Sequence, residues 1–288
     1  MNGEPRLLWA AGAKLGEGAL WDDRIGRLWW VDIHGRQLHR MDETAEERTS
    51  WDLPQEPGHV ALTENPERLI LGLRTGHFLF EPRHGRLDVL TVPQGHSPRH
   101  RLNDGKVDHA GRLWFCTMHE AEQAAEGALH MLGPEWQVVR VAGPFTVPNG
   151  PAFTGDGAVM YLADSPTRTV LAFDVEAGRP VHQRELLRFA EDDGYPDGMT
   201  LDAESGLWVA HWDGGRVSRF AADGSRLDSI RLPVAQVTSC AFGGADLRTL
   251  FITTAGGSGL PGEGPAGGLF AIRTAVSGLR AGRVLVGR

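Results

Sequence analysis

Six positions along the chain share one sequence setting, and four of them carry side-chain oxygens that could bind a cation. Each position begins a short, largely apolar run, and successive positions lie 42, 44, 46, 48 and 42 residues apart. The six residues are Glu17, His59, Asn103, Asn149, Asp197 and Ser239. Two carboxylates and two carboxamides are hard oxygen ligands of the kind that Ca²⁺, Mg²⁺ and Mn²⁺ prefer, and Zn²⁺ also accepts carboxylate oxygen. If the fold brings these positions together, the sequence predicts one divalent-cation site.

The charge and number of these ligands favour a catalytic site over a structural one. The carboxylates of Glu17 and Asp197 would balance the charge of a dication. Four or fewer protein ligands leave coordination positions open, because Ca²⁺ takes about six to eight oxygen ligands. Open positions that hold water or substrate are typical of catalytic metal sites.

The same residues also have a simpler interpretation as turn residues. The segments Asn103–Gly105, Asn149–Gly150 and Asp197–Gly198 are common turn sequences. Three features favour the metal site: the segments recur at a constant period, an apolar run follows each of them at once, and Glu17 belongs to no turn sequence. The turn alternative stays open at this stage.

The period of these positions belongs to a repeat that covers the chain. Six apolar or aromatic runs follow the six positions by about a dozen residues, and their starts lie 41 to 48 residues apart. The runs are Leu28–Asp32, Leu69–Leu73, Leu113–Thr117, Val159–Ala163, Leu207–Ala210 and Leu250–Thr253. This interval is that of one four-stranded propeller blade.

We therefore predict an all-β fold, a six-bladed β-propeller with a central-channel metal site, formed by residues 1–288 as a single domain. A second hairpin follows each pair of runs, in the first blade at Gln37–Met41 and Glu47–Asp52. We expect Arg6–Ala10 to add a strand beside the last repeat, so that both ends of the chain complete one blade. A pair of β-sandwich domains is the alternative, but it would need no constant period, and no linker is visible.

Composition and local patterns exclude several classes of function. The net charge is -8 with no run of Lys or Arg, which argues against nucleic-acid binding. No apolar stretch reaches the roughly 18 residues of a membrane span, and the first residues lack the features of a signal peptide. Cys116 and Cys240 lie in apolar runs and are expected to be buried rather than nucleophilic. We expect a cytoplasmic protein, a monomer or small homo-oligomer, and the net charge identifies no substrate.

The remaining polar residues suggest no second chemistry. The chain has 12 His, none at a metal-binding spacing, and we expect packing or surface roles for them, with His59 and His96 the best placed to line the mouth of the channel. No G-x-S-x-G sequence that would mark a serine nucleophile occurs. The segments Glu120–Gly127 and Ala255–Gly268 are either lids over the channel or plain surface loops.

Several longer motifs resemble the regucalcin (senescence marker protein-30)/gluconolactonase family. The most specific are R-L-N-D-G-K-V-D-H-A-G-R-L-W from Arg101 and P-D-G-M-T-L-D-A-E-S-G-L-W-V-A from Pro196, and the resemblance runs from about Gly16 to Ile272. It implies a six-bladed propeller that hydrolyses sugar lactones with one bound divalent cation (Ca, Zn, Mg or Mn).

The resemblance also implies a role for each site residue. The metal ligands are Glu17, Asn149 and Asp197. Asp197 is also the general base, and Arg101 and Asn103 contact the substrate.

The chain departs from this family at Ala121, which stands where regucalcin-like members carry a second Glu that contacts the substrate. His119 and Glu120 are the candidates to replace it. The resemblance thus implies a metal-dependent hydrolase that opens sugar (aldono-) lactones to sugar acids. The alternatives are a phosphotriesterase-like hydrolase and a calcium-binding regulatory protein without physiological turnover. The pair of Arg101 and Asn103 favours a polyhydroxylated substrate over an apolar phosphoester.

Overall fold

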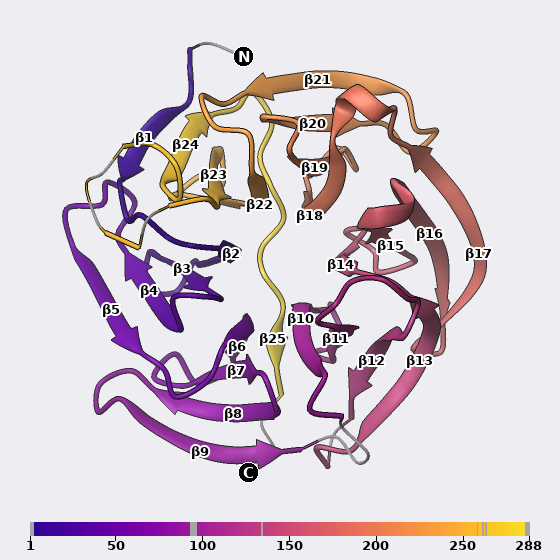
Figure 1. Cartoon of the computed structure of the whole chain (residues 1–288), viewed down its shortest axis with the longest axis horizontal. Coiled ribbons are helices and arrows are strands. Elements are labelled where there is room, and N and C mark those ends of the chain that lie inside the picture. The colour runs from indigo at the N-terminus through magenta and orange to yellow at the C-terminus, as the bar shows by residue number, and fades with distance from the viewer. Residues whose placement is uncertain are drawn as a thin grey trace.

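The strands form six sheets around a central channel, which confirms the six-bladed β-propeller (Figure 1). This computed structural model describes residues 3–92, 97–133, 135–257, 259–260, 262 and 264–285. The blades are numbered here in chain order, and in each the first strand lines the channel. Within the described residues, the helices are the short 3₁₀ turns η1 (Ser165–Thr167) and η2 (Glu191–Asp193), and no helix there is long and apolar enough to cross a membrane.

Each of the first five blades is a hairpin followed by a second hairpin. Blade 1 contains β2 (Gly16–Asp22), β3 (Arg27–Asp32), β4 (Gln37–Met41) and β5 (Arg48–Asp52). Blade 2 contains β6 (Pro57–Thr63), β7 (Leu69–Leu73), β8 (Gly76–Glu81) and β9 (Arg86–Thr91). Blade 3 contains β10 (His100–Val107), β11 (Leu113–His119), β12 (Gly127–Leu132) and β13 (Val138–Phe145). Blade 4 contains β14 (Pro148–Phe153), β15 (Val159–Asp164), β16 (Thr169–Glu176) and β17 (Arg179–Arg188). Blade 5 contains β18 (Tyr195–Leu201), β19 (Leu207–Trp212), β20 (Arg216–Phe220) and β21 (Arg226–Arg231).

Blade 6 is built from both ends of the chain, as predicted. It contains β22 (Val237–Gly243), β23 (Thr249–Thr254) and β24 (Leu269–Arg273), and its outermost strand is β1 (Arg6–Trp9). β1 pairs with β24 in antiparallel register, with Arg6 opposite Ala271. The N-terminal strand therefore closes the ring.

The apolar core is divided among the six interfaces between neighbouring blades. Along β3, Leu28 and Trp30 pack in the cluster shared with blade 6, whereas Trp29 and Val31 pack in the cluster shared with blade 2. Successive side chains of a strand point to opposite faces of the sheet, so a strand between two neighbours needs apolar residues at every position. This explains why the second strand of each blade is a continuous apolar run. Four Trp residues of these strands, Trp29, Trp30, Trp114 and Trp208, are fully buried in this core.

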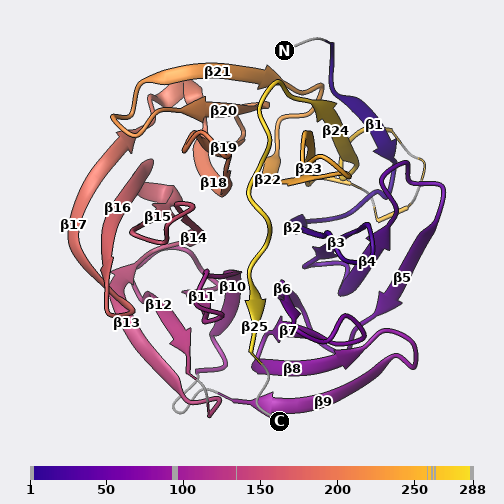
Figure 2. The same cartoon turned by 180° about the vertical axis from the view of Figure 1, so that it is seen from behind.

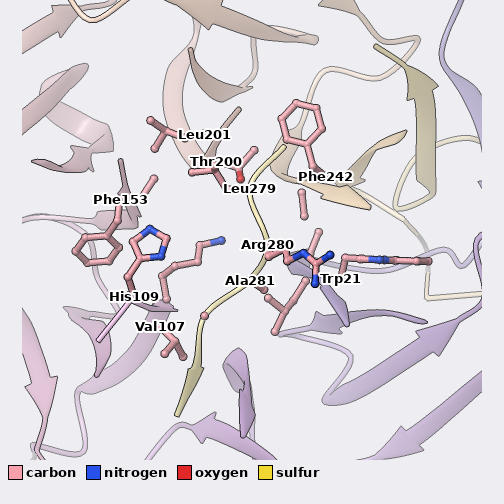
Figure 3. Close-up of a pocket in the computed structure, with 16 residues that line it drawn as sticks. Trp21, Val107, His109, Phe153, Thr200, Leu201, Phe242, Leu279, Arg280 and Ala281 are labelled. Carbon is pink, nitrogen blue, oxygen red and sulfur yellow. The ribbon is translucent and has the colours of Figure 1, made fainter. Parts of the chain in front are cut away.

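The C-terminal residues form a strap across one end of the channel (Figure 2). After β24 the chain crosses the ring, and β25 (Arg283–Val284) pairs in parallel with β6. Between the strap and the finishing ends of the inner strands lies a small cavity of about 70 Å³ (Figure 3). Leu279, Arg280 and Ala281 of the strap line it, and Arg280 pairs with Asp23 of blade 1. The strap thus covers this end of the channel.

Candidate metal and substrate site

A β-bulge in each inner strand marks the six recurring positions. In β2 the register shifts between Glu17 and Leu20, and in β14 it shifts between Asn149 and Ala152. β10 and β18 shift register across Asn103 and Asp197, whereas β6 and β22 shift just before His59 and Ser239. A bulge adds one residue to a strand and changes the direction in which the local side chain points. The interpretation of Asn103, Asn149 and Asp197 as turn residues is therefore wrong, because all three lie within strands.

All five predicted site residues line one cavity, at the starting ends of the inner strands. The cavity has a volume of about 330 Å³ and lies at the end of the channel away from the strap. The predicted residues in its wall are Glu17, Arg101, Asn103, Asn149 and Asp197. The structure thus brings together residues from four blades.

A chain of hydrogen bonds orders the amides of this cavity. Arg101 Nη1 donates to Asn103 Oδ1 at 2.6 Å, and Asn103 Nδ2 donates to Asn149 Oδ1 at 2.7 Å. Asn149 Nδ2 donates to Ser165 Oγ at 2.9 Å, and Ser165 donates in turn to the carbonyl oxygen of Pro196 at 2.7 Å. Asn103 therefore bridges the guanidinium of Arg101 and the amide of Asn149, and the oxygen of Asn149 keeps a second lone pair.

The carboxylates in the channel repel one another. Glu17 is 5% exposed and Asp197 is 6% exposed. Burial raises the pKa of Glu17 well above its usual value, and the charges of Asp197 and Asp104 raise it further. Burial also raises the pKa of Asp197, and Asp104 adds to the effect. In the described part of the chain no Lys, Arg or His forms an ion pair with any of these three carboxylates.

Sequence reasoning missed Asp104 as a member of this group. Asp104 is buried below the cavity, and its Oδ2 accepts a hydrogen bond from the backbone nitrogen of Gly150 at 2.9 Å. The residue stands between Asn103 and Gly105, where the sequence reads as a turn. Only the pairing of β10 with β11 shows that it lies in a bulged inner strand.

This environment fits a divalent cation. Glu17 and Asp197 offer buried charge with no counter-ion among the described side chains, and Asn149 offers an amide oxygen in a fixed orientation. The described residues contain no group of three or more His, Cys, Asp and Glu arranged for a metal. Of the predicted ligands, only Glu17 and Asp197 belong to these residue types. The site would therefore also depend on the amide oxygen of Asn149 and on coordination positions left open to water or substrate.

Glu122, rather than His119 or Glu120, lines the cavity beside Arg101. Glu120 forms an ion pair with Arg74, and His119 Nδ1 accepts a hydrogen bond from the backbone nitrogen of Ala121 at 3.0 Å. Both candidates for the missing acid are therefore engaged outside the cavity, and Glu122 was not among them. The departure from the family at Ala121 indicates this segment, but sequence spacing alone does not show which residue of a loop faces a cavity.

Apolar and aromatic residues also line the cavity. They are Leu15, Ile33, Val147, Pro166, Tyr195 and Trp212. The guanidinium of Arg168 lies 4.1 Å from the ring centroid of Tyr195 and donates to the backbone oxygen of Gly194, which holds Tyr195 in place. A ligand in the cavity meets both polar groups and apolar surface, as in most small-molecule sites.

His59 supports the cavity from behind and does not line its mouth. The ring is buried, and Nδ1 donates to the backbone oxygen of Asn103 at 2.7 Å. Nε2 accepts from Nε2 of His77 at 3.2 Å. A Cβ on Gly72 would lie 2.2 Å from the ring of His59, so this glycine makes room for it. The packing role is confirmed for His59, and His96 lies outside the described residues.

We expect His59 to make the fold sensitive to acid. Burial lowers its pKa to about 4, so the folded chain holds it neutral while the unfolded chain protonates it near its ordinary value. The stability that this group contributes is present above about pH 6.5 and is lost as the pH falls through about 4, with a slope near 1.4 kcal/mol per pH unit.

Urea unfolding between pH 7 and 4.5 measures this effect. His59→Gln should lower the stability at pH 7 and reduce its dependence on pH. The control His182→Gln replaces an exposed histidine and should leave that dependence unchanged. Equal slopes for His59→Gln and the parent protein would contradict the assignment.

Comparisons with known proteins show which family and which relatives this chain resembles. Residues 15–256 match the family model described as "SMP-30/Gluconolactonase/LRE-like region". An L-arabinolactonase of Azospirillum brasilense is 34% identical over 98% of this chain and 95% of its own length. A 6-deoxy-6-sulfogluconolactonase of Pseudomonas putida is 37% identical over 83% of each chain. Among solved structures, a regucalcin of Agrobacterium tumefaciens described as a calcium-binding protein is 25% identical, with a TM-score of 0.89 over 99% of this chain and 97% of that one.

Proposed function

The chain belongs to the SMP-30/gluconolactonase/LRE-like family, and we propose that it is a divalent-metal-dependent lactonase that opens sugar lactones to the corresponding sugar acids. The names of two relatives, an L-arabinolactonase and a 6-deoxy-6-sulfogluconolactonase, support this class of reaction. The observation that carries the proposal is the cavity itself. Its lining combines the buried carboxylates of Glu17 and Asp197 with the side chains of Arg101 and Asn103.

In this proposal Glu17, Asn149 and Asp197 hold one divalent cation. A cation bound there would supply Lewis-acid polarisation of the lactone carbonyl and would lower the pKa of a water molecule. The two carboxylates match its charge, and the hydrogen bond from Asn149 to Ser165 keeps the amide oxygen available. Asn103 lies between Asn149 and Arg101, which couples the cation site to the substrate site.

Asp197 is the proposed general base. Opening a cyclic ester requires a water molecule to lose a proton as it attacks the carbonyl carbon, and a carboxylate within reach accepts that proton. Burial and Asp104 raise the pKa of Asp197, so it is a stronger base than an exposed aspartate. A bound dication would oppose this shift.

Arg101 and Asn103 are the proposed substrate contacts. Arg101 is buried in the wall of the cavity and uses Nη1 for Asn103 and for the backbone oxygen of Leu102. Its other donors are available for the hydroxyl oxygens of a sugar lactone. The aromatic wall with Tyr195 and Trp212 offers a surface for the C–H face of the ring.

A pH-indicator assay across several aldonolactones tests the proposed function. We expect acid release that stops with chelator and returns when Ca²⁺, Mn²⁺, Mg²⁺ or Zn²⁺ is added back. The absence of acid release with every lactone and every metal would refute the proposed lactonase function. Hydrolysis of an organophosphate without hydrolysis of any lactone would favour the phosphotriesterase-like alternative, and tight Ca²⁺ binding without turnover would favour the regulatory protein.

A further inference from the structure

Blade 2 carries a histidine at the position where the blades beside it carry an oxygen ligand. His59 stands at the recurring position of β6, between those of Glu17 and Asn103, but it is not one of the described residues that line the cavity. Its buried ring extends toward β10 of blade 3, where Nδ1 lies 2.7 Å from the backbone oxygen of Asn103. Blade 2 therefore reaches the site through the backbone of the next blade.

A second histidine lies behind the first. His59, Gly72 and His77 stand directly opposite one another on β6, β7 and β8. Neighbouring strands of a sheet lie about 4.8 Å apart, so β6 and β8 are separated by roughly 10 Å, and the two rings meet across the glycine between them. Their Nε2 atoms are 3.2 Å apart, and both rings are buried. A Cβ at position 72 would overlap the ring of His59, so the pair requires this glycine.

The contacts determine which nitrogen of each ring carries a hydrogen. A carbonyl oxygen only accepts, so Nδ1 of His59 must donate to Asn103. Burial lowers the pKa of both histidines, so near pH 7 each ring is neutral and has one N–H group. Nε2 of His59 is then a bare acceptor, and Nε2 of His77 donates to it. The hydrogen bonds therefore run in one direction, from His77 to His59 to the backbone of Asn103.

Asn103 lies where β10 has no regular pairing. The register of β10 with β11 stops at Leu102 and resumes at Gly105, so the bulge leaves Asn103 without a partner residue on that strand. Its side chain nevertheless links two residues of the cavity, because it accepts from Arg101 at 2.6 Å and donates to Asn149 at 2.7 Å. A displacement of this backbone would move the amide and change both hydrogen bonds.

Packing alone does not account for two imidazoles at these positions. A buried polar group costs free energy unless it is hydrogen-bonded, and Nδ1 of His77 is buried with no hydrogen-bond partner among the described residues. Apolar side chains would fill the same space without that cost. Within the described part of the chain, the one group outside the pair to which either ring is hydrogen-bonded is the backbone oxygen of Asn103.

We propose that His59 and His77 are positioning residues of the site, which hold the backbone of Asn103 so that its amide joins Arg101 to Asn149. The inference rests on the proposed lactonase function, because it gives two histidines outside the cavity a role in that reaction. Loss of the hydrogen bond to Asn103 should raise KM more than it lowers kcat, since Arg101 and Asn103 are the proposed substrate contacts.

Paired substitutions at each histidine differ mainly in the hydrogen-bond donor. Asn carries an amide nitrogen near the place of Nδ1, and Leu has a similar shape without a donor. In metal-loaded protein we expect His59→Leu to lower kcat/KM for the best aldonolactone by about tenfold to hundredfold, the effect of outer residues that orient a site. His59→Asn should keep most of the activity. Gln reproduces Nε2 of His77, so His77→Gln should be more active than His77→Leu.

His39→Leu is the matched control. His39 is also a buried histidine, but its ring contacts Ser50, at 2.8 Å from Nδ1, and Trp30 rather than Asn103. It should keep the kcat/KM of the parent protein. Equal kcat/KM for the Leu and amide variants at position 59 or at position 77 would overturn the proposal, and so would equal losses in His39→Leu and His59→Leu.

Nitrogen-15 NMR of the chelated protein separates this inference from the proposed function, because it needs neither substrate nor metal. At pH 7 we expect His59 to carry its hydrogen on Nδ1 and His77 on Nε2. The side-chain amide signals of Asn103 should shift in His59→Leu and stay in place in His59→Asn. If no lactone is hydrolysed but these signals behave as expected, the lactonase fails and the positioning stands. A hydrogen on Nε2 of His59 in the parent protein would refute the positioning even if lactones are hydrolysed.

Discussion

Asp197→Asn is expected to lower kcat for lactone hydrolysis by about 10²- to 10⁴-fold, the contribution of a general base. The amide keeps the size of the side chain and an oxygen that can bind a cation, but it accepts no proton at neutral pH. Cation affinity should fall much less than kcat. Steady-state kinetics with the best aldonolactone and calorimetric titration with Mn²⁺ or Ca²⁺ measure the two effects separately.

Asp104→Asn is the control for this substitution. It also removes a buried carboxylate from the channel, but Asp104 lies below the cavity and bonds to Gly150. We expect it to retain far more activity than Asp197→Asn. Parent-like activity of Asp197→Asn would refute the general-base role, and equal losses in both variants would show that channel charge, rather than a base at position 197, limits the reaction.

Removing the cation is expected to abolish turnover and lower the thermal stability of the fold. A ligand that binds only the folded chain stabilises it by about 4 kcal/mol at a concentration 1,000 times its Kd. Without it, Glu17, Asp104 and Asp197 share the channel with no paired cation among the described side chains. Activity and melting temperature after chelation, and after each metal is added back, test this expectation.

The pH dependence of the chelated protein follows from the same carboxylates. The pKa values of Glu17 and Asp197 are raised in the folded chain. A group with a raised pKa contributes stability at low pH that is lost as the pH rises through the raised value. The chelated protein should therefore lose stability from these groups as the pH rises, and a bound cation should oppose the loss.

Glu17→Gln distinguishes repulsion at this site from general effects of charge. It removes one of the mutually repelling carboxylates, so it should stabilise the chelated protein while weakening the stabilisation by added cation. The stability of the chelated protein should therefore rise, while the stability gained on adding the cation should fall. Glu64→Gln, at an exposed position, should cause neither. A chelated Glu17→Gln protein that is less stable than the chelated parent would contradict the repulsion.

The fold could be predicted because its repeat is carried by residue types that packing requires. A strand such as β3 contacts two neighbouring blades, so Leu28 to Val31 must all be apolar, and the run is visible in the sequence. The closure by β1 also followed from the period. Strand ends were less accurate: β1 ends at Trp9 rather than at Ala10, and β5 begins at Arg48 rather than at Glu47. The outer strands are more exposed than the inner ones, so their apolar pattern is weaker.

The candidate site could be predicted only in part. The constant period placed Glu17, Asn149 and Asp197 in one ring, because equivalent positions of a propeller share an axis. The sequence period could not show the β-bulges, because a register shift depends on the partner strand as well as on the bulged strand. Asp104 and Glu122 were missed for related reasons: one lies inside a bulge that reads as a turn, and the other lies in a loop.

The closure of the ring by β1 has a consequence for the order of folding. Blades 1 to 5 each consist of neighbouring segments, so each can form its hairpins from local contacts. Blade 6 must instead bring Arg6 against Ala271, across nearly the whole chain. The entropy cost of such a long loop grows only slowly with its length, but contacts of this range slow folding. During synthesis β1 has no partner until β24 has been made, whereas every other strand of the ring pairs with a neighbour from the adjacent stretch of chain.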